Sequence, residues 1–492
     1  MLRILIGHSY FLKLDLKQLE RAKPYPPLAT LQAAALLRSA GHEIALFDAM
    51  LADPGDFPPI IGESRPHLFI LYEDNYNFLT KMCLAGMRAA ACEMIRTARR
   101  ANVRVIVAGP DATDDAEPYL KAGADVILLG EGLIALEQLV DRLDEHPGLA
   151  AEALADGVPS AVTLGRPRGR HIRQSGHTAS LPSPTAAQPA QAAWDLIDVD
   201  HYRAVWRRAH GRFSLNMAAS RGCPFRCAWC AKPIWGNRYL QRPAAEVAAE
   251  LVHLKRTFAP DHIWFADDIF GFRVDWVREF SAAVCAADAI VPFTIQTRAD
   301  IVTPRMAETL RAAGCEEAWL GAESGSQRIL DAMRKGTEVF HIIAARERLK
   351  AQGIRVGFFI QLGYLGEQLP DLLATRKLID LARPDEVGVS VSYPLPGTAF
   401  YEEVKSGLGV KTHWHDSGDL AMMFHGSYTS EFYRAVRELL HAEIDVQSLD
   451  AVGGEQDRGT ARADLDRRWE WLIGREREFR NAAWPPVRTI HA

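Results

Sequence analysis

Apolar and polar positions alternate regularly through the first 145 residues of the chain. Five short apolar runs are typical of strands: residues 2–7, 43–48, 67–72, 104–109 and 125–130. Three longer segments have the spacing of helices: residues 28–40, 79–101 and 133–143. A further short helix is expected before Gly123. Apolar strands that alternate with helices predict a parallel sheet with both faces covered. Ligands of such sheets bind beyond the carboxyl ends of the strands.

A second alternation of the same kind begins at Phe213. Its expected strands are six: residues 213–219, 262–265, 292–296, 317–321, 355–362 and 386–392. Helices fit between these strands, for example at 244–257 and 304–313. Six strand–helix units predict a partial (β/α)6 barrel of the TIM type, whose functional residues belong at the carboxyl ends of its strands.

The fold class is therefore α/β, with a Rossmann-like sheet at 1–145 and a partial barrel at 213–405. Residues 146–212 break the alternation and include the Ser/Pro/Ala-rich stretch SGHTASLPSPTAAQPAQAAW, which favours a linker. Residues 406–492 are expected to form a helical C-terminal region. His413 and His415 in that region are interpreted as surface or packing residues rather than metal ligands.

Composition excludes several classes of protein. The chain has 492 residues, 48% hydrophobic and 24% charged, which is typical of a globular protein. A net charge of −5 gives no electrostatic reason to expect nucleic acid or an anionic membrane as a partner. No window approaches the ~18 apolar residues of a membrane span, and the N-terminus lacks the pattern of a signal peptide. A cytoplasmic location is expected.

Cysteine usage points to chemistry rather than to disulfides. Seven cysteines are an odd number, and three of them fall in one loop, SRGCPFRCAWCAKP. The other four lie in apolar or helical contexts and are expected to be buried core thiols: Cys83, Cys92, Cys285 and Cys315.

The three clustered cysteines, Cys223, Cys227 and Cys230, have the spacing C-x3-C-x2-C. A structural zinc site would require a fourth cysteine or histidine at short spacing. The nearest later candidates, His253 and His262, lie beyond a predicted helix. Three thiolates suit a [4Fe–4S] cluster with one iron left open for a ligand.

With Trp229 before its last cysteine, this loop resembles the cluster loop of the radical S-adenosylmethionine (SAM) superfamily. The resemblance implies that Cys223, Cys227 and Cys230 hold a [4Fe–4S] cluster whose open iron binds the amino and carboxylate groups of SAM. It implies reductive cleavage of SAM to a 5′-deoxyadenosyl radical, with electrons from a flavodoxin or ferredoxin. Trp229 would lie near the adenine.

Later strand ends resemble the same superfamily, in the expected order. WFADDIFGF is similar to the turn that contacts the SAM amino group, QTRAD offers a cation to an anionic group, and the fourth strand ends in GAESGS. VGFFIQLGYLGE resembles the fifth-strand glycine motif, and YPLPGTAFYEE a loop after the sixth strand. The SAM-binding residues implied by these motifs are Asp267, Asp268, Arg298, Glu323, Ser324 and Gly363, with Gly366 and Glu367 in the glycine motif.

Taken alone, each of these motifs has an ordinary structural explanation. Asp267 and Asp268 would also serve as a cation site or a helix cap, and Glu323 as a helix N-cap. Gly363 and Gly366 would also fit plain turns. The order of the motifs along the chain favours the SAM-binding interpretation.

The N-terminal sheet resembles that of the cobalamin-binding members of the superfamily. VAGPDAT and AGADVILLGEG are similar to their glycine-rich strand ends, with Pro110 in place of a second glycine. The sheet has no G-x-G-x-x-G dinucleotide pattern and no D-x-H-x-x-G cobalt-ligating motif. The resemblance implies a base-off cobalamin whose lower face meets residues within 72–77, from Tyr72 to Asn77. The implied cobalamin-binding residues are Gly109, Gly130, Glu131 and Gly132.

These resemblances imply a cobalamin-dependent radical SAM methyltransferase acting on an unactivated carbon of a small molecule. A hydrophobic or ring-containing substrate is favoured by the apolar, aromatic loops. An oxidative cyclase or rearrangement enzyme of the same architecture is the alternative. A non-catalytic iron–sulfur binding or sensor protein is a remote alternative.

Overall fold

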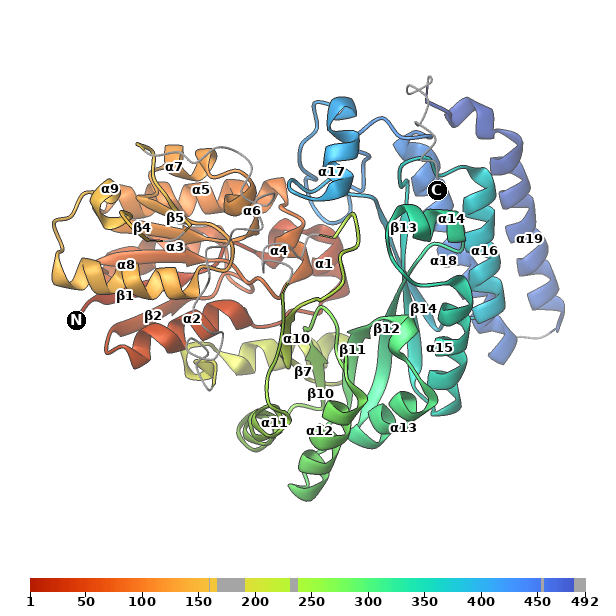
Figure 1. The fold of residues 1–492 in the computed structure, drawn as a ribbon, viewed down its shortest axis with the longest axis horizontal. Coiled ribbons are helices and arrows are strands. Elements are labelled where there is room, and N and C mark those ends of the chain that lie inside the picture. Colours follow the sequence, from red (N-terminus) through yellow and green to blue (C-terminus); the bar gives the residue numbers. More distant parts are fainter. Residues whose placement is uncertain (159, 166–190, 231–237, 453–454, 482–492) are drawn as a thin grey trace. The chain divides into compact units, whose positions relative to one another are not determined.

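The computed structural model describes residues 1–158, 160–165, 191–230, 238–452 and 455–481 (Figure 1). By their contacts these residues form two compact units. Unit 1 comprises Met1–Gly222, Ala231–Ala266 and His413–Asp419. Unit 2 comprises Cys223–Cys230, Asp267–Thr412 and Leu420–Ala492. Unit 1 thus contains the strands Ser214–Met217 and His262–Phe265 as well as the first sheet, together with a short segment of the C-terminal region.

The first sheet lies in unit 1 and has the strand order β2-β1-β3-β4-β5-β6. Its strands are β1 (Arg3–Gly7), β2 (Glu43–Phe47), β3 (Leu68–Tyr72), β4 (Arg104–Ala108), β5 (Val126–Leu128) and β6 (Ala161–Val162). The first five are parallel, as predicted, whereas β6 pairs antiparallel with β5. β6 comes from the segment that the sequence favoured as a linker.

Helices cover both faces of this sheet, because successive strand side chains point to opposite sides. Ile4 and Ile6 of β1 face one apolar core, and Leu5 faces the other. The first core includes α2 (Leu28–Ser39) and α8 (Leu133–Glu145). The second core includes α3 (Phe57–Ser64), α5 (Ala85–Arg100) and α7 (Glu117–Ala122) (Figure 1).

The single helix expected at 79–101 is interrupted. The structure has α4 (Phe78–Lys81) and then α5, with Cys83 between them at φ 55°. A left-handed backbone at a residue other than glycine cannot continue an α-helix. α6 (Pro110–Asp114) follows β4.

Residues beyond the first sheet carry more structure than a linker would. They form α9 (Ala151–Leu154), η5 (Trp194–Leu196) and α10 (Val199–His210). Within unit 1, Tyr202 of α10 donates a hydrogen bond to Asp48 at 2.7 Å, and Trp206 donates to the Pro24 carbonyl at 2.7 Å. Most of the Ser/Pro/Ala-rich stretch lies outside the described residues.

The second sheet contains the six strands expected for the barrel, in the order β14-β13-β12-β11-β10-β7. They are β7 (Ser214–Met217), β10 (His262–Phe265), β11 (Phe293–Thr297), β12 (Cys315–Glu323), β13 (Arg355–Leu362) and β14 (Glu386–Val391). Helices between strands include α11 (Ala244–Phe258), α12 (Val274–Ala286), α13 (Pro304–Ala313), α15 (Val339–Ala351) and α16 (Leu369–Ala382). An antiparallel pair, β8 (Ser220–Gly222) and β9 (Tyr239–Gln241), was not expected. The partial barrel of mixed α/β type is confirmed.

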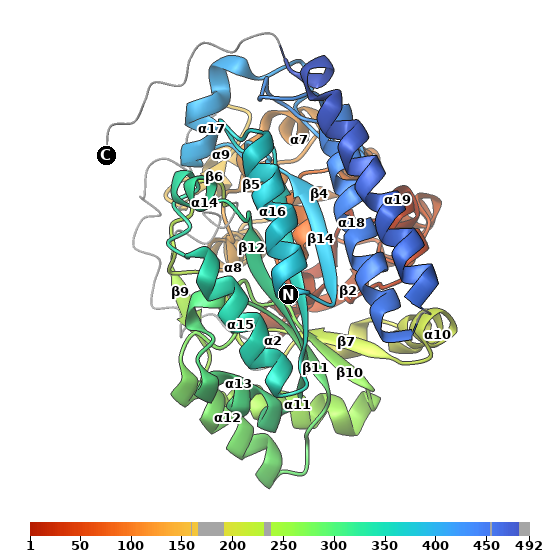
Figure 2. The same ribbon diagram turned by 90° about the vertical axis from the view of Figure 1, so that its right-hand side faces the viewer.

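Two long helices end unit 2. α18 (Ser430–Val452) packs on α16 and β14, and α19 (Glu455–Gly474) packs on α18 (Figure 2). Residues 408–429 contain no helix, so the helical C-terminal region begins later than expected. No helix in the described part of the chain combines the length and apolar character that crossing a membrane requires.

Three of the four isolated cysteines are buried as expected: Cys83, Cys92 and Cys315. Burial raises the pKa of the Cys315 thiol. Cys285 is exposed, contrary to expectation, because it lies on the outer side of α12. This exposed thiol provides a control position for experiments on the clustered cysteines.

Candidate active site

The cysteine loop is anchored through its backbone within unit 2. The Ala228 amide donates to the Met333 carbonyl at 2.9 Å, and the Ala228 carbonyl accepts from the Phe400 amide at 2.9 Å. Met333 ends α14 (Gln327–Ala332), and Phe400 lies in α17 (Ala399–Val404). The chain between Cys227 and Cys230 is therefore fixed by two elements that are distant in sequence.

The three thiols differ in exposure. Cys223 is buried, whereas Cys227 and Cys230 are partly exposed. Among the described residues, no group of three or more His, Cys, Asp or Glu side chains is arranged to hold a metal ion. The donor set still fits an iron–sulfur cluster in its chemistry, since three thiols share one eight-residue loop without a described disulfide. Their role as cluster ligands stays a prediction.

Arg298 contacts this loop directly. Its Nη1 lies 3.8 Å from the Cys227 Sγ, and its guanidinium lies 3.7 Å from the centre of the Phe225 ring. Asp300 accepts two hydrogen bonds from the guanidinium, at 2.9 and 2.8 Å. Nη2 also donates to the Lys335 carbonyl and the Thr337 hydroxyl. Arg298, the cation expected after the third strand, therefore contacts a thiol and a carboxylate of the chain itself.

Replacing Arg298 with alanine is expected to lower SAM cleavage and iron retention by about 10- to 100-fold, the usual cost of losing a residue that orients a metal ligand. The guanidinium would no longer hold Phe225 or donate to Cys227. The exposed Arg305 on α13 provides the control, Arg305→Ala. Iron per chain and the rate of 5′-deoxyadenosine formation measure the effect. Equal values for the two variants would contradict this role.

Trp229 packs against an apolar cluster at the base of the loop. The cluster contains Ile329, Met333, Tyr364, Phe400, Val404 and Phe424. The Trp229 Nε1 is buried and has no hydrogen-bond partner among the described residues. An unpaired indole N–H is a donor that a polar group of a bound molecule would satisfy. Its expected place near the adenine stays a prediction.

The second- and fourth-strand residues lie where the sequence places them. Asp267 is buried and Asp268 half-buried, and one residue, Ala266, separates them from the end of β10. Glu323 ends β12 with a left-handed backbone, φ 60°, at a bulge in the pairing with β13. Its carboxylate forms a buried ion pair with Lys335 at 2.8 Å. Backbone of this kind outside glycine costs about 1–3 kcal/mol and occurs preferentially at functional sites.

The Ser324 hydroxyl forms hydrogen bonds within the protein. Its hydroxyl lies 3.3 Å from the Thr375 hydroxyl and accepts a hydrogen bond from the Ser326 amide at 3.1 Å. Ser326 in turn donates to Asp371 at 2.6 Å. These contacts fasten the turn after β12 to α16, so the structure favours a local structural role for the Ser324 hydroxyl.

A hydrogen bond to Glu367 closes the turn of the fifth-strand glycine motif. The Gly363 amide donates to Glu367 at 2.6 Å, while the second carboxyl oxygen of Glu367 is buried without a partner among the described residues. Gly363 has φ 75°, and a Cβ there would meet the Met422 side chain at 2.8 Å. The left-handed backbone therefore favours glycine here without any ligand, and the Met422 side chain would have to shift to admit a Cβ.

Burial raises the pKa of Glu367 from 4.5 to about 8, against the opposing hydrogen bond from the Gly363 amide. Between these values the unfolded chain has released a proton that the folded chain keeps, so stability falls as pH rises. The free energy of unfolding should drop by up to about 1.4 kcal/mol per pH unit in this window. Glu367→Gln should remove that slope, and exposed Glu308→Gln should not. Urea unfolding of cluster-free protein from pH 5 to 9 tests this, and parallel curves for wild type and Glu367→Gln would refute it.

In unit 1, neighbouring protein side chains lie too close for a Cβ at two of the three glycines at the strand ends. A Cβ on Gly109 would meet Glu73 at 2.6 Å, and a Cβ on Gly132 would meet Leu128 at 2.9 Å. Gly130 has a left-handed φ of 80°, and its amide donates a hydrogen bond to the Thr113 hydroxyl at 3.0 Å. The hypothesis that a ligand approaches the backbone closely therefore applies best to Gly130.

Most side chains of the segment from Tyr72 to Asn77 form hydrogen bonds within the protein. The Tyr72 hydroxyl donates to the Glu131 carbonyl, Glu73 accepts from Ser9, and Asp74 accepts from the amides of Ala29 and Tyr76. Asn77 caps α4. Asn75 is different: it is 1% exposed, and neither polar atom of its amide has a partner among the described residues.

Arg221 is a residue of unit 1 that the sequence analysis did not single out. It lies on β8, two residues before Cys223, and its guanidinium forms an ion pair with Glu131. The Glu131 carboxylate therefore accepts a hydrogen bond from a side chain of the protein itself. A charged residue among the small, apolar residues of MAASRGC was the available signal.

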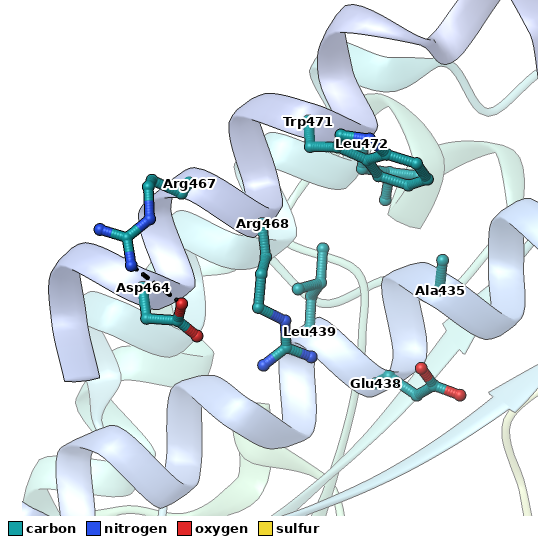
Figure 3. Close-up of a pocket in the computed structure, with 8 residues that line it drawn as sticks. All are labelled: Ala435, Glu438, Leu439, Asp464, Arg467, Arg468, Trp471 and Leu472. Atoms are coloured by element: carbon teal, nitrogen blue, oxygen red, sulfur yellow. Dashed lines mark hydrogen bonds and ion pairs between the residues drawn. The ribbon is translucent and has the colours of Figure 1, made fainter.

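A groove of about 390 Å³ lies apart from all the predicted site residues, between α18 and α19 (Figure 3). Its lining residues are Ala435, Glu438, Leu439, Asp464, Arg467, Arg468, Trp471 and Leu472. Arg467 is paired with Asp464 at 3.0 Å. None of these residues offers the donor set of a cofactor site.

Comparison with known proteins assigns the barrel. Residues 217–379 match the model of the radical SAM superfamily. This region contains the three clustered cysteines and every residue predicted to bind SAM.

Relatives extend the similarity over most of the chain. An uncharacterized methyltransferase, PH0819 of Pyrococcus horikoshii, is 25% identical over 79% of this chain and 81% of its own length. The anaerobic magnesium-protoporphyrin IX monomethyl ester cyclase of a Synechocystis species is 24% identical over 64% of this chain and 60% of its own length. Among solved structures, the radical SAM methyltransferase TsrM of Kitasatospora setae, with cobalamin and a [4Fe–4S] cluster bound, has a TM-score of 0.65. It is 17% identical and the match covers 82% of this chain and 74% of TsrM, which confirms the fold.

Proposed function

We propose that the chain is a cobalamin-dependent radical SAM methyltransferase that acts on an unactivated carbon of a small molecule. The observation that carries this proposal is the radical SAM domain at 217–379 in a chain whose fold matches TsrM over 82% of its length. A relative named as a methyltransferase, similar over 79% of the chain, supports methyl transfer.

In this proposal Cys223, Cys227 and Cys230 would hold a [4Fe–4S] cluster. Such a cluster would supply the electron for reductive cleavage of SAM, and cobalamin would supply the carrier of the methyl group. Arg298 holds the Cys227 side of the loop by its contacts to Phe225 and Cys227. The electron donor is a flavodoxin or ferredoxin in a reducing cytoplasm, which agrees with seven free cysteines.

Asp267 and Asp268 would meet the SAM amino group. Glu323, paired with Lys335, would meet the ribose or the methionine moiety. Trp229 would offer its unpaired indole N–H beside the adenine. Gly363, closed by Glu367, would shape the backbone of the same region without contacting SAM through a side chain.

In unit 1 the cobalamin would bind at the carboxyl ends of the strands, along Gly109 and the Gly130–Glu131–Gly132 loop. Of residues 72–77, Asn75 is the one that would be expected to contact the cofactor. A buried amide with four hydrogen-bonding positions and no described partner is costly, and a ligand would relieve that cost.

An oxidative cyclase is the second candidate, favoured by the similarity to the magnesium-protoporphyrin ester cyclase. That protein's name specifies a ring-containing substrate, which agrees with the expectation of a hydrophobic or ring-containing substrate here. The cyclase match spans 60% of that protein, less than the 81% of the methyltransferase relative, so methyl transfer is favoured.

The corrinoid content of protein purified anaerobically from cobalamin-supplied cells tests the proposal. About one corrinoid and about four irons per chain are expected, the iron being that of one cluster. Reduction should then cleave SAM to 5′-deoxyadenosine. Protein with a cluster but no corrinoid would exclude the methyltransferase, and a reduced cluster that leaves SAM intact would favour the non-catalytic alternative.

A further inference from the structure

Arg221 is a buried cation with an unusual number of partners in unit 1. Its side chain is 9% exposed. Nε donates to the Tyr76 hydroxyl at 2.7 Å, Nη1 bonds to Glu131, and Nη2 bonds to Gln32. The Tyr76 ring also lies 5.8 Å from the guanidinium carbon. All three nitrogens are therefore used.

The three partners come from separate segments at the carboxyl edge of the first sheet. Tyr76 follows β3, Glu131 follows β5, and Gln32 lies in the first half of α2. Glu131 is fixed on its other side as well, because its carbonyl accepts the Tyr72 hydroxyl at 2.7 Å. A guanidinium with a rigid fork of donors suits such simultaneous bonds, whereas an ammonium group does not.

The ion pair with Arg221 matters because of where Glu131 lies in the chain. Glu131 lies between Gly130 and Gly132, whose backbones are left-handed at φ 80° and 70°. The loop that is proposed to approach cobalamin therefore presents its only carboxylate to Arg221. Arg221 itself is joined through Gly222, at φ 70°, to Cys223. A single residue, Gly222, separates Arg221 from the first proposed cluster ligand.

We propose that Arg221 is a positioning residue that couples the Gly130–Glu131–Gly132 loop to the cysteine loop. This inference rests on the proposed function, since it assumes that the first loop contacts cobalamin and the second holds the cluster. A ligand that reorients Glu131 changes the anchor of β8 and hence the setting of Cys223. Such coupling is reciprocal, so a cluster on the cysteine loop must change the affinity for cobalamin by the same factor.

Equilibrium dialysis of hydroxocobalamin against cluster-free and cluster-loaded protein measures the coupling without any turnover. In the wild type the two Kd values should differ by about fivefold or more, the usual lower range for coupled sites. In Arg221→Lys, which keeps the charge but loses the fork of donors, the two values should converge. Arg38→Lys, which alters a surface pair with Asp195 in the same unit, should retain the wild-type ratio.

Glu131→Gln provides a second variant if Arg221→Lys does not fold, and it should also bring the two Kd values together. Equal Kd values in the wild type would overturn the coupling while leaving the proposed function intact. A wild-type ratio retained in Arg221→Lys or Glu131→Gln would overturn the assignment to Arg221. Failure of the wild type to bind hydroxocobalamin in either form would overturn the proposed function itself.

Discussion

Replacing Cys227 with alanine is expected to abolish the broad visible absorption of the cluster and SAM cleavage together. Two thiolates remain, and a cluster that requires three protein ligands is then lost. Mutating a residue that only orients a metal ligand typically lowers metal affinity or activity by about 10- to 100-fold. Loss of a ligand itself should therefore lower the rate of 5′-deoxyadenosine formation by more than about 100-fold.

Cys285→Ala is the matched control, since Cys285 is an exposed cysteine on α12 that belongs to neither proposed cofactor site. Iron, sulfide and absorbance at 400 nm should be unchanged in that variant. SAM cleavage that persists in Cys227→Ala would refute the ligand assignment. Loss of the cluster in both variants would point to general instability rather than to ligation.

Gly130→Leu is expected to weaken cobalamin binding by about tenfold or more, equivalent to about 1.4 kcal/mol, and to leave the cluster intact. A side chain at this strand end would occupy the space that the proposal assigns to the ligand. The left-handed φ of 80° adds backbone strain of about 1–2 kcal/mol. Equilibrium dialysis with hydroxocobalamin measures the first effect, and iron content measures the second.

Gly41→Leu separates strain from ligand exclusion. Gly41 also has a left-handed backbone, φ 92°, and a Cβ there would meet nothing within 4 Å. It precedes β2 and so lies at the amino edge of the same parallel sheet, opposite the strand ends. The hydroxocobalamin Kd of Gly41→Leu should match the wild type. Equal Kd values for Gly130→Leu and the wild type would mean that the N-terminal site is misplaced.

Periodicity alone predicted most of the architecture. The apolar runs that became β1 to β5, β7 and β10 to β14 are local signals, since each strand carries its pattern within a few residues. Most of these strands are largely buried, whereas the edge strand β2 is not. The break between α4 and α5 has no such signal, because an alanine-rich, arginine-rich sequence continues the helical pattern past Cys83. β6 was missed because two residues are too short for any periodic pattern.

Site residues were predictable where a motif is contiguous and not where the contact is long-range. The cysteine loop, Arg298 and the GAESGS turn each follow a recognisable strand end. The pairing of Arg221 with Glu131 joins residues 90 positions apart, and no local pattern encodes it. Likewise, no local pattern shows that a Cβ on Gly109 would meet the Glu73 side chain, 36 positions away in the sequence.

The central claim is methyl transfer by radical chemistry, and one reaction tests it most directly. Reconstituted protein is supplied with SAM carrying a deuterated methyl group, hydroxocobalamin, a low-potential reductant and a fractionated extract of small molecules from the source cells. With the active fraction, 5′-deoxyadenosine and S-adenosylhomocysteine should increase together, and a metabolite should acquire the deuterated methyl group. Deoxyadenosine that increases without S-adenosylhomocysteine and without a labelled metabolite would contradict methyl transfer and favour the cyclase.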